Sequence, residues 1–227
     1  MAVNFVEKVD DRVKIQHALI SVSDKTGLDQ LIPALVAVNP SIRIFSTGGT
    51  YKAIERILGE GAGANLTQVS DYTGQPETQG GLVKTLDFKI YLGLLTETYN
   101  DDHQGDLQRT AAAAIDLVVV NLYPFSATVA QADVTVEMAR ANIDIGGPCM
   151  VRASAKNYLR VTSVTDPADY SQLIEQLRAG GGGLTIAQRF EYARKAFAHT
   201  AQYDKAISEY LAGQDPEALS TVYTLAD

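Results

Sequence analysis

The sequence predicts an α/β protein with a doubly wound, mainly parallel sheet and a C-terminal helical extension. Residues 17–22 and 42–45 are short apolar runs, and each leads through a polar or glycine turn into a segment with helical apolar spacing. Residues 115–122 form a further run, which is apolar and β-branched on both faces and is typical of a strand covered on both sides. This strand–turn–helix order indicates parallel strands with helices on both faces of the sheet.

Composition narrows the class of protein and of partner. The chain has 227 residues, which is enough for one large domain, alone or with an appendage. A formal net charge of −8 argues against a nucleic-acid partner, because such a partner requires a basic face. Cys149 is the single cysteine, so an internal disulfide is excluded. No apolar run could span a membrane and no signal peptide is visible, so we expect a cytoplasmic protein.

The first strand–turn–helix unit carries hydroxyls and an ammonium group at its turn. The strand over 17–22 runs into this turn, and a helix over 28–38 follows. Ligands of an open parallel sheet bind at the carboxyl ends of its strands, so the turn is a candidate phosphate site. Ordinary helix capping by Ser23 or Asp24 explains the same residues. The candidate ligands are Ser21, Ser23, Lys25 and Thr26.

The second unit has two adjacent glycines, Gly48 and Gly49, between the strand at 42–45 and a helix over 51–58. Glycine lets an anion approach the backbone closely, and the free N–H groups at a helix start favour negative charge. A plain strand-to-helix turn is the alternative interpretation. Two neighbouring units of the same design favour a phosphate cradle, to which this turn contributes Ser46, Thr47, Gly48, Gly49 and Thr50.

The middle of the chain is less regular. We predict a third strand at 65–69, a turn-rich loop over 70–84, a strand at 89–96, a polar surface loop at 100–105 and a helix at 108–114. A loop as long as the one over 70–84 is more often functional than not.

The second half of the chain returns to regular elements. Helices are predicted at 134–142, 149–157 and 167–178, with a strand at 161–164. Four glycines at 180–183 then suggest a linker before a long amphipathic helix over 185–211. We therefore expect two parts, an α/β domain at 1–179 and an extension at 180–227 whose helix packs on the body or on a second subunit.

Four polar residues are candidates for chemistry: Lys84, Tyr123, Asp144 and Lys156. Each lies near the end of an element or in a glycine-rich turn, so their side chains can reach one crevice. Each also has an ordinary structural explanation. Lys84 can be a surface lysine and Tyr123 an aromatic residue at the rim of the sheet. Asp144 can be a helix cap, and Lys156 can interact with the dipole at a helix C-terminus. No spacing suggests a metal site, and serine-nucleophile motifs are absent.

Several segments together resemble a known family. They are SVSDKTGL (21–28), STGGT (46–50), VKTL (83–86), DLVVVNLYPF (116–125), NIDIGGP (142–148), SAKNY (154–158), DPADY (166–170) and KAFAHTAQYD (195–204). In this order they resemble the IMP cyclohydrolase domain of the bifunctional AICAR formyltransferase/IMP cyclohydrolase, within the methylglyoxal synthase-like superfamily. The formyltransferase domain of that family has no counterpart in these segments.

The resemblance implies a reaction and its residues. The family closes the ring of FAICAR to IMP with loss of water, the last step of de novo purine biosynthesis, with no cofactor or metal. It implies a homodimer that binds a purine ribonucleotide, and a separate formyltransferase could be a partner. The family's catalytic residues fall on Lys84, Tyr123, Asp144 and Lys156. The substrate and phosphate contacts fall on Ser21, Ser23, Lys25, Thr26, Ser46, Thr47, Gly48, Gly49, Thr50, Thr85, Asn121, Gly146 and Gly147.

The sequence departs from the family pattern between residues 75 and 93. Leu82 replaces an arginine that helps to hold the nucleotide, Asp87-Phe88 replaces His-Pro, and Tyr91-Leu92 replaces His-Gly. These changes support an alternative function, a non-catalytic nucleotide- or phosphate-sensing module of the same superfamily. Retention of all four catalytic candidates favours the cyclohydrolase. Methylglyoxal synthase itself is a weaker option, because its aspartate and histidine motifs are not found.

Overall fold

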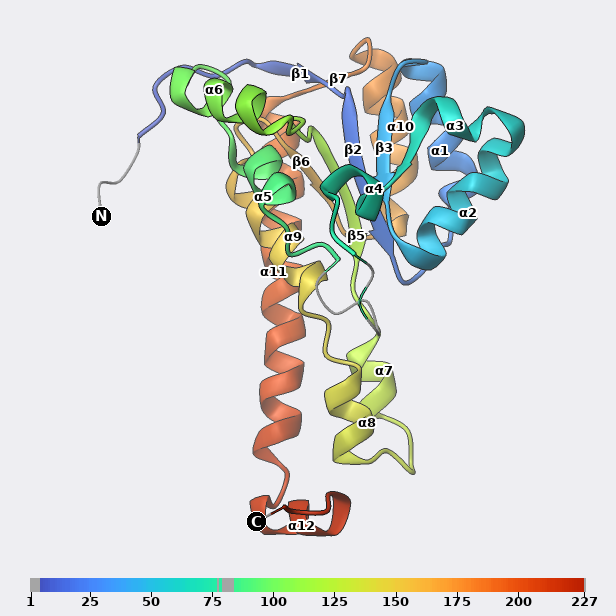
Figure 1. Cartoon of the computed structure of the whole chain (residues 1–227), viewed down its shortest axis with the longest axis vertical. Helices are drawn as coiled ribbons and strands as arrows, with labels where there is room; N and C mark the ends of the chain where they lie inside the picture. Colours follow the sequence, from blue (N-terminus) through green and yellow to red (C-terminus); the bar gives the residue numbers. More distant parts are fainter. Residues whose placement is uncertain (1–4, 77, 79–83, 227) are drawn as a thin grey trace.

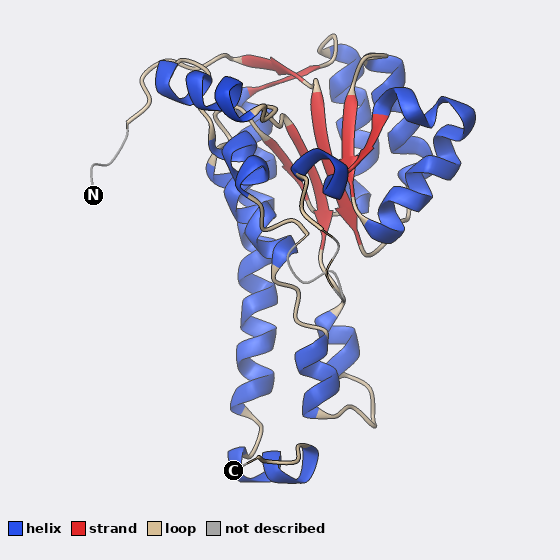
Figure 2. Ribbon diagram, in the orientation of Figure 1, coloured by secondary structure: helices blue, strands red, loops and turns tan. Residues whose placement is uncertain are grey.

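The structure, a computed structural model, describes residues 5–76, 78 and 84–226. Its centre is a five-stranded parallel sheet with strand order β4-β3-β2-β5-β6 and helices on both faces (Figures 1 and 2). The predicted doubly wound α/β fold is confirmed. The strands are β2 (His17–Val22), β3 (Arg43–Ser46), β4 (Leu66–Gln68), β5 (Leu117–Asn121) and β6 (Thr162–Val164).

Alternate residues of the three central strands, β3, β2 and β5, belong to opposite cores, which is the physical basis of the two helical layers. On β2, Ala18 and Ile20 face one core and Leu19 faces the other. The first core is covered by α1 (Leu28–Val38), α2 (Gly48–Leu58) and α10 (Tyr170–Ala179). The second is covered by α5 (Phe88–Leu95), α9 (Gly146–Lys156) and α11 (Ile186–Ala212). All three strands in the middle of the sheet are therefore buried on both faces.

Two predictions for the middle of the chain are wrong. The segment predicted as a strand at 89–96 instead lies in helix α5 up to Leu95: the Asp87 side chain accepts a hydrogen bond from the Lys89 N–H, which caps the helix. Ile90 and Leu94, spaced four residues apart, then pack into the second core. The expected loop at 100–105 is the start of α6 (Asp101–Thr110), capped by Asn100. That helix ends at Thr110, so the predicted helix at 108–114 is confirmed only in its first residues.

The glycine run at 180–183 forms a turn followed by a strand. Gly181 and Gly182 have φ angles of 59° and 88°, and Gly183 begins β7 (Gly183–Thr185). β7 pairs in antiparallel fashion with β1 (Arg12–Lys14), so this segment is tied to the N-terminal part of the chain. The run is therefore part of the folded body rather than an open linker.

Helix α11 is anchored at its start and runs well past the sheet. Thr185 and Gln188 form a reciprocal capping box. Fully buried Arg189 donates hydrogen bonds to backbone carbonyls of the N-terminal segment, of the segment after α9 and of β7. The helix packs on α9, β6 and α7 (Phe125–Val129).

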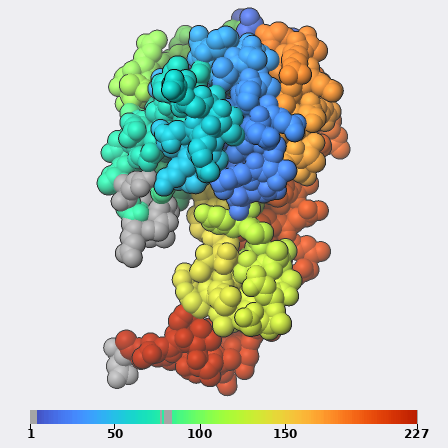
Figure 3. Space-filling model, turned by 90° about the vertical axis from the view of Figure 1, so that its right-hand side faces the viewer, coloured from blue at the N-terminus to red at the C-terminus, as the bar shows by residue number. Residues whose placement is uncertain are grey.

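The far half of α11 belongs to a narrower projection below the sheet. Figures 1 and 3 show α7, α8 (Val136–Ala141) and the C-terminal residues beside it. The short α12 (Leu219–Val222) contacts α8. Among the helices of the described residues, none combines the length and the apolar character needed to cross a bilayer.

Candidate functional site

The carboxyl ends of β2, β3 and β5 open onto a cavity of about 520 Å³ (strand ends in Figure 2). The start of α9 and the Lys84-Thr85 segment complete its wall. Fourteen of the seventeen residues predicted for the site line this cavity. They are Ser21, Ser23, Lys25, Thr47, Gly48, Gly49, Thr50, Lys84, Thr85, Asn121, Tyr123, Asp144, Gly146 and Gly147. Leu82, the replacement for the family arginine, lies outside the described residues.

One end of the cavity has the features of an anion site. Gly48 starts α2 with a φ of 49°, and the helix has no side-chain cap at Thr47. A Cβ atom added to Gly48 would lie 3.9 Å from the Lys84 Nζ, and one added to Gly49 would lie 3.8 Å from the Lys25 Nζ. Two ammonium groups therefore lie against the glycine turn and the helix start, where a phosphate is favoured. The hydroxyls of Ser21 and Thr47, 3.3 Å apart, lie at the same end.

Three of the predicted hydroxyl ligands have other roles in the fold. Ser46 is fully buried, and its hydroxyl donates to the Ile20 carbonyl at 2.7 Å. Thr50 lines the cavity, but its hydroxyl accepts from the Val22 N–H and donates to the Val22 carbonyl, both at 3.0 Å. Thr26 is exposed and lies outside the cavity lining, with its N–H directed to Asp24. Ser46 and Thr26 are thus not brought to the cavity, because strand pairing and a turn use them.

Asn121 lines the cavity but its amide is already engaged. It accepts from the Asp24 N–H and donates to the Asp24 carbonyl, both at 2.8 Å. The residue therefore holds the loop that carries Ser23 and Lys25 against the end of β5. In the structure this is a supporting contact, whereas the resemblance implies a substrate contact.

The other end of the cavity is built around Asp144. Its carboxylate accepts a hydrogen bond from the Gly147 N–H at 2.8 Å, at the start of α9. A Cβ atom on Gly147 would lie 2.5 Å from the Asp144 Oδ2, and one on Gly146 would lie 2.4 Å from the Thr85 Oγ1. Glycine at both positions is therefore required for the loop, the helix start and the Thr85 segment to meet.

Burial raises the pKa of the Asp144 carboxyl above its usual range, against the opposing effect of hydrogen bonds from the Gly147 and Tyr123 backbone. A carboxylate of this kind is a better proton acceptor than an exposed one. Tyr123 follows β5 and is 54% exposed, so its phenol stands at the cavity mouth. The cavity also has an apolar wall, formed by Val22, Val120, Ala141, Ile143, Ile145 and Met150.

Lys156 is not brought to the cavity. It is the last residue of α9, whereas Gly146 at the cavity wall is the first, and eleven helical residues span about 15 Å. Its side chain is exposed, and it is absent from the residues that line the cavity. The unbroken helix is the physical reason for this placement.

Sequence reasoning missed the residue that contacts the Asp144 loop from the C-terminal helix. The Tyr203 hydroxyl accepts from the Asp144 N–H at 2.8 Å and donates to the Asn142 carbonyl at 3.3 Å. Tyr203 lies 59 residues from Asp144 in sequence. The sequence signal for Tyr203 is its position in the family-like segment KAFAHTAQYD (195–204), and this position does not show which residues Tyr203 contacts.

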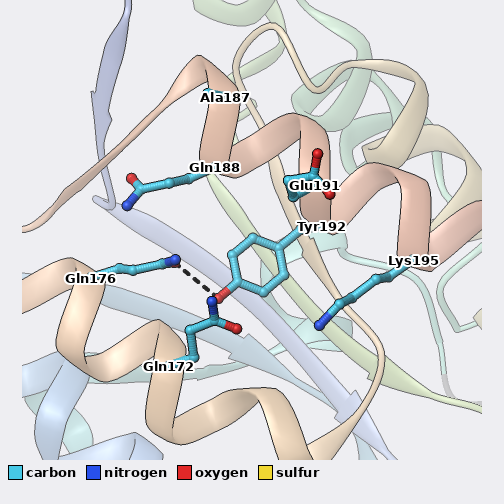
Figure 4. A pocket seen from close by; sticks show the side chains of 7 residues that line it. All are labelled: Gln172, Gln176, Ala187, Gln188, Glu191, Tyr192 and Lys195. Carbon is cyan, nitrogen blue, oxygen red and sulfur yellow. Dashed lines mark hydrogen bonds between the residues drawn. The ribbon is translucent and has the colours of Figure 1, made fainter.

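A second cleft, of about 330 Å³, lies between α10 and α11 (Figure 4). Several of its polar groups already have hydrogen-bond or ion-pair partners. The Tyr192 hydroxyl donates to Gln176 at 3.0 Å, and Lys195 pairs with Asp169 at 2.6 Å. Gln188 serves the helix cap. This cleft is a groove between packed helices, and the first cavity is the stronger candidate.

No metal centre is indicated in the described part of the chain. Within it, no three histidine, cysteine or carboxylate side chains gather as a group that could hold a metal ion. The cavity instead presents lysines, hydroxyls and helix N-termini, which are groups that bind anions.

Comparison with known proteins gives two family matches and a structural neighbour. The model of the MGS-like domain matches residues 27–149, and that of the AICARFT/IMPCHase bienzyme matches residues 154–226. The crystal structure of ForH is similar with a TM-score of 0.71 and 30% sequence identity. That match covers 86% of this chain and 98% of the ForH chain.

Proposed function

The chain belongs to the MGS-like domain family and has the AICARFT/IMPCHase bienzyme match in its C-terminal third, and from this premise we propose that it is an IMP cyclohydrolase. The reaction is the closure of FAICAR to IMP with loss of water. The observation that carries the proposal is one cavity that gathers Lys84, Tyr123 and Asp144 with the glycine turn at Gly48.

The substrate would lie with its phosphate at the glycine turn. Lys25, Lys84 and the start of α2 supply the positive charge for a dianion in a protein with an overall negative charge. The imidazole ring would then lie along the apolar wall, with its two reactive substituents near Asp144. Both reacting groups belong to the same molecule, so the main task of the site is to hold their productive rotamers.

The bond changes follow from this placement. The carboxamide nitrogen attacks the formyl carbon, a C–N bond forms, and Asp144 accepts a proton from that nitrogen. Lys84 and Tyr123 donate hydrogen bonds to the formyl oxygen as charge develops on it. One well-placed donor of this kind contributes on the order of 3 kcal/mol. The oxygen takes up one proton to give a ring hydroxyl; this hydroxyl then takes up a second proton, the formamido nitrogen loses its proton, and the C–O bond breaks to release water as the C=N bond of the closed ring forms.

Replacement of the proposed base tests the function. Asp144→Asn is expected to abolish IMP formation from FAICAR in an absorbance assay and to leave IMP binding by calorimetry within about twofold of the wild type, because the phosphate end is unchanged. Asp133→Asn, an exposed aspartate between α7 and α8, is the matched control and should keep full activity.

Binding and turnover assays on the wild-type chain distinguish the cyclohydrolase from the nucleotide-sensing module. IMP binding without any turnover would overturn the cyclohydrolase and favour a nucleotide-sensing module. Retained turnover in Asp144→Asn would remove the base assignment alone. The half-buried Asp144 with its raised pKa supports the catalytic alternative, since a sensor has no need of a proton acceptor.

A homodimer in the cytoplasm, supplied with substrate by a separate formyltransferase, is part of the same proposal. Large apolar side chains support a partner surface near the cavity mouth: Tyr123 and Ile145 are 54% and 58% exposed. Light scattering on the purified chain tests it, and a monomer at micromolar concentration would argue against it.

A further inference from the structure

We propose that Tyr203, on the C-terminal helix α11, is the residue that positions Asp144 for catalysis. The inference rests on the proposed function and deepens it, because it gives the C-terminal helix a part in the active site. Asp144 lies in the short connection between α8 and α9, and the Tyr203 hydroxyl bonds to two points of this connection.

The two hydrogen bonds fix the backbone on both sides of Ile143. Tyr203 accepts from the Asp144 N–H at 2.8 Å and donates to the Asn142 carbonyl at 3.3 Å. A phenol hydroxyl has one proton to give and can accept as well, so a single group satisfies both backbone partners. A phenol is protonated at neutral pH, and burial raises the pKa of Tyr203 further, so its hydroxyl can make both bonds.

The ring of Tyr203 contacts the neighbouring segment that carries Tyr123. It meets Phe125 edge-on, with ring centroids 6.2 Å apart. Phe125 is 1% exposed, and its N–H donates to the Tyr123 carbonyl at 2.8 Å. One side chain of α11 thus touches the Asp144 connection through its hydroxyl and the Tyr123 turn through its ring.

This arrangement accounts for how Asp144 is held half-buried at the cavity. Its carboxylate is fixed by the Gly147 N–H, and its own N–H is fixed by Tyr203. Without the second contact, the connection is free to shift outward and expose the carboxylate to water. A displacement of about 1 Å at a reacting group is enough to lower a rate by about 100-fold.

Helix α11 offers a matched control for the experiment. Tyr210 also meets Phe125 edge-on, with centroids 5.9 Å apart, but in the described part of the chain its hydroxyl makes no hydrogen bond. Tyr203→Phe and Tyr210→Phe therefore make the same chemical change on the same helix against the same aromatic partner. Only the first removes the bonds to the Asp144 connection.

Steady-state kinetics with FAICAR give the first readout. We expect Tyr203→Phe to lower kcat by about 10-fold, to change KM by less than about twofold, and to move the acid limb of the kcat profile to lower pH. The acid limb moves this way because an Asp144 carboxylate that gains water approaches its ordinary pKa. Tyr210→Phe should keep kcat within about twofold and leave the acid limb in place. A Tyr203→Phe enzyme with wild-type kcat and acid limb would overturn the proposal.

A readout without turnover separates this inference from the proposed function. Carbon-13 NMR titration of the Asp144 carboxyl should show a lower pKa in Tyr203→Phe than in Tyr210→Phe or the wild type. Hydrogen exchange of the Asp144 amide in the unchanged chain should be slow, which tests the contact even if the variant does not fold. Fast exchange, or an unchanged titration, would overturn the positioning role whether or not the wild type turns over FAICAR.

Discussion

Asn121, the last residue of β5, and Asp24, in the loop after β2, exchange two hydrogen bonds of 2.8 Å each. The pair joins the carboxyl ends of two adjacent parallel strands through one side-chain amide. Since an amide both donates and accepts, only asparagine or glutamine chemistry makes both bonds at this position. The loop that carries Ser23 and Lys25 is thereby held at the rim of the cavity.

Asn121→Asp should weaken phosphate binding without unfolding the protein. The carboxylate cannot donate to the Asp24 carbonyl, so one bond is lost and the loop carrying Lys25 moves. We expect KM for FAICAR to rise by about 10-fold and the free energy of unfolding to fall by about 1 kcal/mol. Asn39→Asp is the matched control, because Asn39 makes a similar pair of bonds with the Ile15 carbonyl and the Ser41 N–H away from the cavity. A KM that is equal in the two variants would contradict the prediction.

Lys25→Ala should reduce affinity for the nucleotide through its phosphate. A charge-assisted bond contributes about 1.5–3 kcal/mol, so the Kd for IMP is expected to rise by about 10-fold or more. The loss should shrink as salt concentration rises, because Lys25 is exposed and its charge is screened. Calorimetry at two ionic strengths measures both effects. Lys52→Ala, at an exposed position on α2, is the control, and an equal loss there would point to net charge instead of the glycine turn.

Gly147→Ala should displace the proposed base. The new Cβ would lie 2.5 Å from the Asp144 Oδ2 and 2.6 Å from the Leu122 Cδ2, so the carboxylate has to move. We expect kcat to fall by at least about 10-fold while the glycine turn still binds phosphate. Gly105→Ala, in α6 with no heavy atom within 4 Å of the added Cβ, should keep full activity and stabilise its helix by up to about 1 kcal/mol. Wild-type kcat in Gly147→Ala would place the reacting atoms elsewhere.

The pH dependence of activity and stability should share one cause. Burial raises the pKa of Asp144, so kcat is expected to fall as the pH drops through a value above the usual aspartate range of about 4. The folded protein holds this proton more tightly than the unfolded chain does. The proton on Asp144 therefore stabilises the folded state fully below the pKa of this carboxyl in the unfolded chain. This stabilisation is lost as the pH rises through its pKa in the folded protein. Asp144→Asn should accordingly unfold at a higher urea concentration than the wild type at pH 7, with a difference that disappears towards pH 4. A difference independent of pH would contradict this assignment.

The elements that sequence patterns located well are those with strong local signals. The strand at 17–22 and the helix at 28–38 have the observed bounds, because their apolar periods match the two cores. The segment at 89–96 is predicted as a strand from a loose alternation of apolar and polar residues, and this is wrong because the cap at Asp87 starts a helix. The glycines at 180–183 predict a linker, because the pairing of β7 with β1 joins residues about 170 positions apart and leaves no local signal.

The predictions for the site also divide into those carried by local sequence signals and those that depend on tertiary contacts. Local turn chemistry was sufficient to select Gly48, Lys25 and Thr47, which all line the cavity. It could not distinguish a free hydroxyl from one already bonded, as at Ser46 and Thr50, since their partners Ile20 and Val22 come from the neighbouring strand. The family resemblance groups Lys156 with Asp144, but a sequence motif does not show that the length of α9 separates the two residues.

The sequence by itself determined the parallel α/β fold, the two strand–turn–helix units and the candidate anion-binding residues at their turns. These depend on periodicity, glycine content and helix starts, which are properties of consecutive residues. The tertiary structure decided which of those residues meet in one cavity, that Asn121 supports a loop, and that Tyr203 reaches Asp144 from 59 residues away. Such contacts depend on how helices and strands pack, and packing joins segments whose separation along the chain leaves no local pattern to read.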